Sequence, residues 1–121
     1  MKKFIFLLIL LPMVFATSCD KTSQLIVFKK KMTYKVSGTA EEILVTYVNE
    51  KGETDMTGLS VGTIPWTLEF SAKPDTYVYL QAKNATDTGM VEVQIFQGDA
   101  ALFSDENDLP FGAATCSGFV K

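Results

Sequence analysis

The segment Met-Thr-Tyr-Lys-Val-Ser-Gly, residues 32–38, alternates apolar and polar side chains and ends at a glycine. Successive side chains of a β-strand point to opposite faces, so Met32, Tyr34 and Val36 share one face of a half-buried strand. The same period of two recurs at residues 43–48, 66–71, 77–82 and 91–95. This recurrence predicts an all-β fold.

Turn-forming residues separate these predicted strands. Gly, Asn, Pro and Asp gather at residues 49–52, 72–75, 84–89 and 98–99. We expect residues 55–62 to be a loop with a weak strand, residues 104–108 an acidic loop, and residues 112–120 the last strand. No segment predicts an amphipathic helix longer than about two turns. Seven or eight short antiparallel strands predict one β-sandwich domain over residues 32–121.

The composition narrows the classes of function. All eleven basic residues are Lys, and the sequence has no His. Residues 1–18 are expected to be removed, as explained in the next paragraph, and they contain Lys2 and Lys3. The remaining chain then has nine Lys and fourteen Asp and Glu, a net charge of −5 (9 − 14). Nucleic-acid binding is therefore not expected. General acid–base catalysis usually relies on His, and zinc or copper sites on His or several Cys, so we expect no catalytic residues, no metal and no cofactor.

The N-terminus has the organisation of a secretion signal. A basic start, Met-Lys-Lys, precedes an apolar run at residues 4–15. A membrane-spanning helix needs about twenty apolar residues, so this run is too short to span a bilayer. Three small residues, 16–18, then precede Cys19, which is typical of a lipoprotein signal whose cysteine accepts a diacylglycerol. We expect residues 1–18 to be removed and Cys19 to be lipidated; ordinary secretory cleavage and an uncleaved anchor are the alternatives.

Residues 19–31 are predicted to be a lipid-anchored tether that ends in an edge strand. Residues 20–24 are polar, residues 25–28 apolar, and residues 29–31 are three Lys. Lysines discourage unwanted pairing at a sheet edge, which favours the strand. The alternative interpretation places the three lysines near anionic lipid headgroups. The expected location is the bacterial cell envelope, at the outer membrane, with the membrane itself as a partner.

Four residues stand out as candidate structural or binding positions. Pro65 fixes its backbone and lacks an N–H, which suits the start of a strand at Trp66, the only tryptophan. Trp66 is interpreted as a core residue, or else as an exposed aromatic platform for a ligand. Tyr77 and Tyr79 project from one strand face, as rim residues or as a recognition stripe.

Cys116 is the only cysteine besides Cys19. A lone thiol in an oxidising envelope is usually buried, and we expect Cys116 in the core; a reactive thiol or an intermolecular disulfide is the alternative. The acidic group Asp105, Glu106 and Asp108 is interpreted as a solvated loop. Weak Ca²⁺ binding is the alternative there, although the spacing is not that of an EF-hand.

From Tyr34 onward the chain resembles the MmpS family, small accessory proteins of MmpL-type lipid exporters. The matching pieces are residues 34–40 (YKVSGTA), 45–47 (VTY), 64–66 (IPW), 78–82 (VYLQA), 93–99 and 114–116 (ATC). The resemblance implies an immunoglobulin-like β-sandwich that assists an exporter of lipids or siderophore-like molecules.

Two features depart from that family. It has a membrane-spanning helix where this chain has a lipoprotein signal, so the membrane face that carries the domain is in doubt. It also tends to pair its late cysteine, here Cys116, with a cysteine on the strand that holds residues 91–95, where this chain has none. An apolar contact is expected to replace that disulfide.

Together these features predict a lipid-anchored, non-enzymatic envelope protein, an accessory or binding module for a membrane transport system. Its expected partners are a membrane transporter or a lipidic cargo. The alternative is a surface adhesion or carbohydrate-binding lipoprotein, which would need an exposed stripe built from Trp66, Tyr77 or Tyr79.

Overall fold

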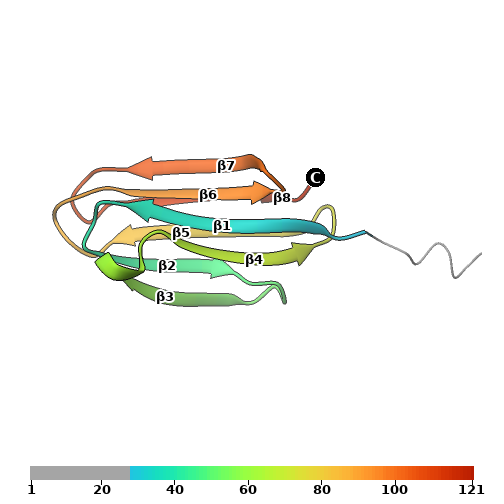
Figure 1. Ribbon diagram of the computed structural model, residues 1–121, viewed down its shortest axis with the longest axis horizontal. Coiled ribbons are helices and arrows are strands. Elements are labelled where there is room, and N and C mark those ends of the chain that lie inside the picture. Colours follow the sequence, from blue (N-terminus) through green and yellow to red (C-terminus); the bar gives the residue numbers. More distant parts are fainter. Residues whose placement is uncertain (1–27) are drawn as a thin grey trace, which may run out of the picture.

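A computed structural model describes residues 28–121, which form two stacked antiparallel sheets (Figure 1). Sheet 1 has the strand order β4-β1-β6-β7, and sheet 2 has the order β3-β2-β5-β8. The strands are β1 (Lys30–Gly38), β2 (Glu42–Val48), β3 (Thr54–Ser60), β4 (Trp66–Ala72), β5 (Tyr77–Asn84), β6 (Val91–Gln97), β7 (Ala100–Asn107) and β8 (Ala113–Phe119). A single 3-10 turn, Val61–Thr63, precedes β4.

The predicted fold class, an all-β sandwich of seven or eight strands, is confirmed. The expected signal peptide, Cys19 and most of the expected tether lie outside the described residues, as do residues 25–27 of the expected edge strand. Phe28 and Lys29 are described and belong to no strand, because β1 begins at Lys30. Strand β1 is not at an edge: it lies between β4 and β6.

Two sequence-based expectations about loops need correction. Residues 55–62, expected to be a loop with a weak strand, belong mostly to the full strand β3, which pairs with β2 over seven residues. The expected acidic loop at residues 104–108 belongs, up to Asn107, to strand β7. Both are edge strands with largely exposed side chains, so their sequences lack the apolar alternation that marks a half-buried strand. Backbone pairing with a neighbour, rather than burial, keeps them extended.

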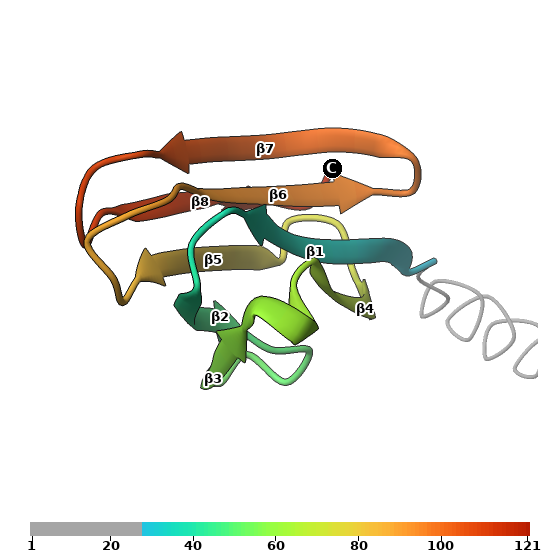
Figure 2. The ribbon, with the colours of Figure 1, turned by 60° about the vertical axis from the view of Figure 1, so that its left-hand side comes forward.

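The sandwich has two different ends, and we name them by where the chain enters. The proximal end comprises residues 28–31, 48–54, 72–77, 97–100 and 119–121, and the distal end comprises residues 38–42, 60–66, 84–91 and 106–113. This division follows from the antiparallel registers. Both ribbon views show the start of β1, the β6–β7 hairpin and the C-terminus at the same end (Figures 1 and 2).

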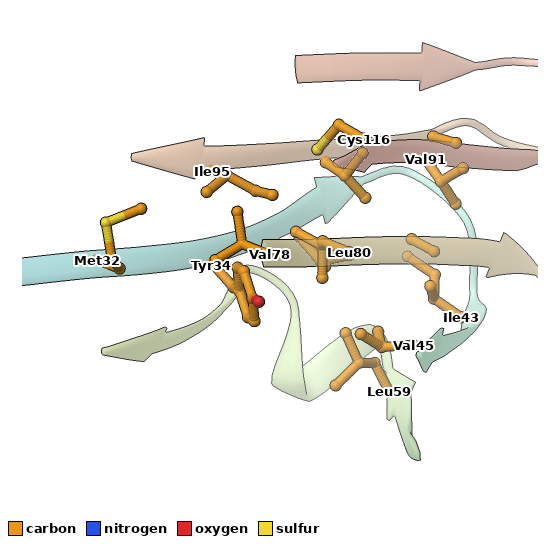
Figure 3. Close-up of a cluster of buried hydrophobic side chains, with 14 of the residues drawn as sticks. Met32, Tyr34, Ile43, Val45, Leu59, Val78, Leu80, Val91, Ile95 and Cys116 are labelled. Atoms are coloured by element: carbon orange, nitrogen blue, oxygen red, sulfur yellow. The ribbon is translucent and has the colours of Figure 1, made fainter. Parts of the chain in front are cut away.

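The core fills the space between the sheets with the inward residues of β1, β2, β5, β6 and β8 (Figure 3). Met32, Tyr34 and Val36 are fully buried, as the alternation in residues 32–38 predicts. In the described chain, Asn84 is the one buried residue with a polar side chain outside this apolar set. Its side-chain amide donates to the Thr88 carbonyl (2.8 Å) and its oxygen accepts from the Thr86 N–H (2.8 Å), which orders the distal turn after β5.

Glycine is required where the chain crosses between sheets at the distal end. Gly38 has φ +142°, and a methyl group on it would overlap the carbonyl oxygen of Met90. That carbonyl accepts the N–H groups of Thr39 (3.0 Å) and Ala40 (3.2 Å), which join the β1–β2 link to the turn before β6. Any side chain at position 38 would push these two segments apart.

The Tyr34 side chain links the two sheets through one hydroxyl group. Tyr34 belongs to β1 of sheet 1, and its hydroxyl donates to the Val48 carbonyl (2.7 Å) and accepts the Tyr79 N–H (3.3 Å). The β2–β5 ladder runs only from Ile43 to Tyr47 on β2. The hydroxyl therefore satisfies backbone groups of the two strands just beyond their last paired residues, where an unpaired buried group would be costly.

Aromatic rings pack around Tyr34 in the same half of the sandwich. Its ring centroid lies 4.7 Å from that of Phe70 and 5.9 Å from that of Tyr47. Tyr47 in turn lies 5.4 Å from Trp66. Such tilted and edge-on pairs stabilise beyond the area they bury, by about 0.5–1.5 kcal/mol each.

We predict that Tyr34→Phe lowers the free energy of unfolding by about 1–3 kcal/mol, because it removes the partner of both the Val48 carbonyl and the Tyr79 N–H while keeping the ring. Urea unfolding followed by circular dichroism measures the change. Tyr77→Phe is the matched control, because Tyr77 lies exposed on the outer face and should tolerate the loss of its hydroxyl. Equal stability of the two variants would contradict the role given to Tyr34.

Candidate functional site

The outer face of sheet 2 is a broad surface with little charge. Each of its four strands contributes four outward residues. They are Thr54, Met56, Gly58 and Ser60 of β3; Glu42, Leu44, Thr46 and Val48 of β2; Tyr77, Tyr79, Gln81 and Lys83 of β5; and Ala113, Thr115, Ser117 and Phe119 of β8. Of these sixteen, only Glu42 and Lys83 are charged, and both lie toward the distal end. Four strands about 4.8 Å apart and seven residues long cover about 450 Å².

Large apolar side chains are exposed on this face. Leu44 is 40%, Met56 61%, Tyr77 45% and Phe119 60% exposed. Between them lie short polar side chains, such as Gln81, whose amide donates to the Thr115 hydroxyl (3.3 Å). Exposed aromatic residues and methionine, together with few charges, are the composition that distinguishes the core of a protein–protein interface from ordinary surface.

The outer face of sheet 1 has the opposite character. Thirteen strand residues point outward from this sheet: three from β4, four from β1, three from β6 and three from β7. Five of them are charged: Lys31, Lys35, Glu69, Glu92 and Glu106. Lys31 forms an ion pair with Glu69 (3.7 Å), and the Ser37 hydroxyl donates to Glu92 (3.1 Å). This is a solvated face of a half-buried sheet, so the low charge of sheet 2 is not a general property of the molecule.

A shallow apolar hollow of about 430 Å³ lies at the distal edge of the low-charge face. Its lining combines the exposed Leu44 and Gly58 with the edges of two core residues, Ile43 and Leu59. Polar groups of Glu42, Ser60 and Thr63 stand at its rim. The hollow is large enough for part of an apolar side chain or acyl chain and offers no cluster of groups suited to catalysis.

Sequence reasoning indicated only part of this surface. It placed Tyr77 and Tyr79 on one strand face, and both do point outward from β5, with Tyr79 half-buried. Leu44, Met56 and Phe119 were not singled out. Leu44 could have been found as an apolar residue at an outward position between Ile43 and Val45, whereas Met56 lay in a segment expected to be a loop.

Trp66 does not join the two tyrosines. It pairs with Val36 on the inward side of sheet 1, is half-buried, and packs against Tyr47 of the opposite sheet. Pro65 lies directly before it, ahead of the first residue of β4. The structure therefore places Trp66 in the core packing at the edge of the sandwich, on the other side of sheet 2 from Tyr77 and Tyr79.

Cys116 is buried in the core on β8, in the same cluster as Val91, Val93 and Ile95. Burial raises the pKa of its thiol from 9.0 to about 12, and the nearby Asp105 carboxylate adds to the rise. The reactive form of cysteine is the thiolate, so this environment favours an inert thiol over a nucleophile.

The acidic residues near the end of β7 do not converge. Asp105 and Glu106 are neighbours in a strand and point to opposite faces, and Asp105 accepts the Thr115 N–H of β8 (3.0 Å). Asp105 thus satisfies backbone at the edge of sheet 2. Within residues 28–121, no three His, Cys, Asp or Glu side chains lie close enough together to hold a metal ion.

Comparison with known proteins does not indicate a function. No protein-family model matches the chain, and no curated protein is significantly similar to it. In the part of the chain that the structure describes, no helix has the length and apolar character needed to cross a membrane. The low-charge face of sheet 2, with its adjoining hollow, is the candidate functional site.

Cys116 predicts a specific loss of stability at alkaline pH. Its folded pKa is about 12 and its ordinary value is 9.0, so the unfolded chain loses the proton first as pH rises. The thiol therefore contributes stability that is complete below pH 9 and is lost as pH rises toward 12. When the pH rises from about 8 to about 11, the free energy of unfolding should fall less in Cys116→Ala than in the unchanged protein. The two decreases should differ by up to about 2 kcal/mol.

Urea unfolding at the two pH values measures this difference. Tyr34, whose pKa burial also raises to about 12, is present in both proteins, so its burial contributes to both alike. An identical loss of stability in both proteins would show that the Cys116 thiol is not held in its neutral form by the fold.

Proposed function

We propose that this protein is a lipid-anchored, non-enzymatic module of the bacterial cell envelope that binds a component of a membrane transport system through the outer face of sheet 2. The observation that carries the binding role is the contrast between the two outer faces. One has two charges among sixteen residues and exposes Leu44, Met56, Tyr77 and Phe119; the other has five charges among thirteen.

The anchor is supported by the sequence. The short apolar run at residues 4–15, the small residues 16–18 and Cys19 follow one another as in a lipoprotein signal. The non-enzymatic role is supported by the lack of His and Arg in the whole sequence and by the outward-pointing, dispersed acids of the described domain. Neither the signal sequence nor the dispersed acids indicate which partner the protein binds.

The choice of a transport component rests on the resemblance to the MmpS family, with its immunoglobulin-like sandwich. A protein partner fits the low-charge face better than a soluble ligand does, because the face is broad and its hollow is shallow. A lipidic cargo would instead use the hollow beside Leu44 and Leu59. A carbohydrate-binding role keeps the exposed Tyr77–Phe119 pair and the half-buried Tyr79 but loses Trp66, which faces the other way.

The anchor is tested by the intact mass of the protein purified from membranes. We expect a chain that begins at Cys19 and carries the added mass of a diacylglycerol. Cys19→Ala should leave the protein unacylated. A native product that retains Met1, or that has an unmodified Cys19, would overturn the anchor.

The binding face is tested by site-specific photo-crosslinking in living cells. A photo-reactive residue in place of Met56 on sheet 2 should crosslink to a membrane transport protein, identified by mass spectrometry. The same residue in place of Thr67, which is exposed on the outer face of sheet 1, is the matched control and should not. Identical products from both positions, or only glycan or lipid products from position 56, would reject the proposed partner.

A further inference from the structure

The lysines of the domain gather at one end of the sandwich. Of the eight lysines in residues 28–121, six lie at the proximal end: Lys29, Lys30, Lys31, Lys51, Lys73 and Lys121. Lys35 lies within β1 and Lys83 near the end of β5. The residue ranges of the distal end contain no lysine, and Lys83 lies directly before them, opposite Ala113. These six are far apart in sequence and come together because β1, β3 and β5 begin where β2, β4 and β8 end.

The acids are distributed in the opposite sense. The proximal ranges contain four acids, Glu50, Glu53, Asp75 and Asp99, and a net charge of +2 (6 − 4). Asp55 and Glu69, the ion-pair partner of Lys31, lie just inside these ranges. The distal end has five, Glu41, Glu42, Asp87, Glu106 and Asp108, and a net charge of −5 (0 − 5). A domain that is acidic as a whole thus presents a basic end and an acidic end.

Exposed aromatic rings lie at the basic end. Phe28 is 79% exposed where the chain enters the sandwich, and Tyr77 and Phe119 form an exposed edge-on pair with centroids 5.7 Å apart. Tyr77 also lines a small hollow of about 150 Å³ together with Lys29, Lys73 and Glu50. Aromatic rings next to lysines are the combination that proteins place at a membrane–water interface.

The covalent connection points the same end toward the membrane. The chain enters the sandwich at Phe28, and only nine residues separate Cys19 from Lys29. Nine residues span at most about 30 Å when fully extended, so an acylated Cys19 would keep the proximal end near the bilayer surface.

We propose that the proximal end binds the surface of an anionic phospholipid bilayer directly, with its lysines on the headgroups and Phe28, Tyr77 and Phe119 at the interface. This goes beyond the proposed function and does not depend on acylation, because the groups belong to the described domain. The acidic distal end, with the hollow beside Leu44, then points away from the lipid. One or two of these lysines in contact with the headgroups predict roughly tenfold tighter binding to anionic than to zwitterionic vesicles.

The test uses the mature chain with Cys19→Ser, so that no acyl group contributes, in co-sedimentation with vesicles. We expect it to bind phosphatidylcholine vesicles that contain phosphatidylglycerol, to bind pure phosphatidylcholine at least tenfold more weakly, and to be released by high salt. Equal binding to both vesicles, or no binding to either, would overturn the proposal. Acylation of the native protein is measured separately by intact mass, so either idea can fail alone.

Matched variants locate the binding surface. Lys30→Gln with Lys73→Gln should weaken binding to the anionic vesicles about tenfold, whereas Lys35→Gln with Lys83→Gln removes the same charge elsewhere and should weaken it less than threefold. For the aromatic pair, Tyr77→Ser with Phe119→Ser should weaken binding. Leu109→Ser with Phe111→Ser, equally exposed at the distal end, should not. Equal effects of proximal and distal variants would reject the proposed orientation, and circular dichroism confirms that each variant is folded.

Discussion

The hydroxyl of Tyr34 is the contact on which the arrangement of the sandwich most depends. It reaches from sheet 1 to the backbone of β2 and β5 in sheet 2. There it bonds the Val48 carbonyl and the Tyr79 N–H, just beyond the last residues that these two strands pair with each other. Hydrophobic packing holds the sheets together without fixing how they sit on one another, since it has no direction. A buried hydroxyl with two specific partners does have a direction, and it sets the position of Val48 and Tyr79.

Those two residues begin the proximal half of sheet 2. Beyond Val48 the chain turns at Asn49, whose side-chain oxygen accepts the N–H groups of Lys51 (2.9 Å) and Glu53 (3.0 Å). Before Tyr79 lies Tyr77, one ring of the exposed pair with Phe119. The core contact of Tyr34 is therefore connected to the surface that carries lysines and aromatic rings. The same aromatic cluster draws Trp66 inward, which explains why the most conspicuous candidate for ligand binding is a packing residue.

The sequence alone predicts the strands that bury one face and underestimates those that do not. Alternation identified β1, β2, β4, β5, β6 and β8, because burial requires apolar residues at every second position. Strand β3 buries only Leu59, and β7 lies at an edge with none of its residues fully buried, so neither shows the pattern. The turns were predictable because Asn and Gly have local reasons to be there.

The candidate site was less accessible to such reasoning. The outward position of Tyr77 and Tyr79 follows from the alternation within one strand. The low charge of the whole face does not, because it depends on β3, β2, β5 and β8 being neighbours, an order that a local pattern cannot encode. The gathering of Lys30, Lys73 and Lys121 at one end has the same origin. Both surface properties are consequences of topology, and they carry the proposed contacts with lipid at one end and with a partner along one face.

The orientation of the acylated protein on a bilayer tests this account most directly. The remaining thiol, Cys116, is buried, so a cysteine introduced at Asp75 or at Asp87 can be labelled selectively with a fluorophore. Strands of seven to nine residues separate these two positions by roughly 25 Å along the sandwich. In vesicles with a quencher on the lipid headgroups, the label at position 75 should be strongly quenched and the label at position 87 only weakly. Equal quenching, or stronger quenching at position 87, would contradict a domain that stands on its basic end.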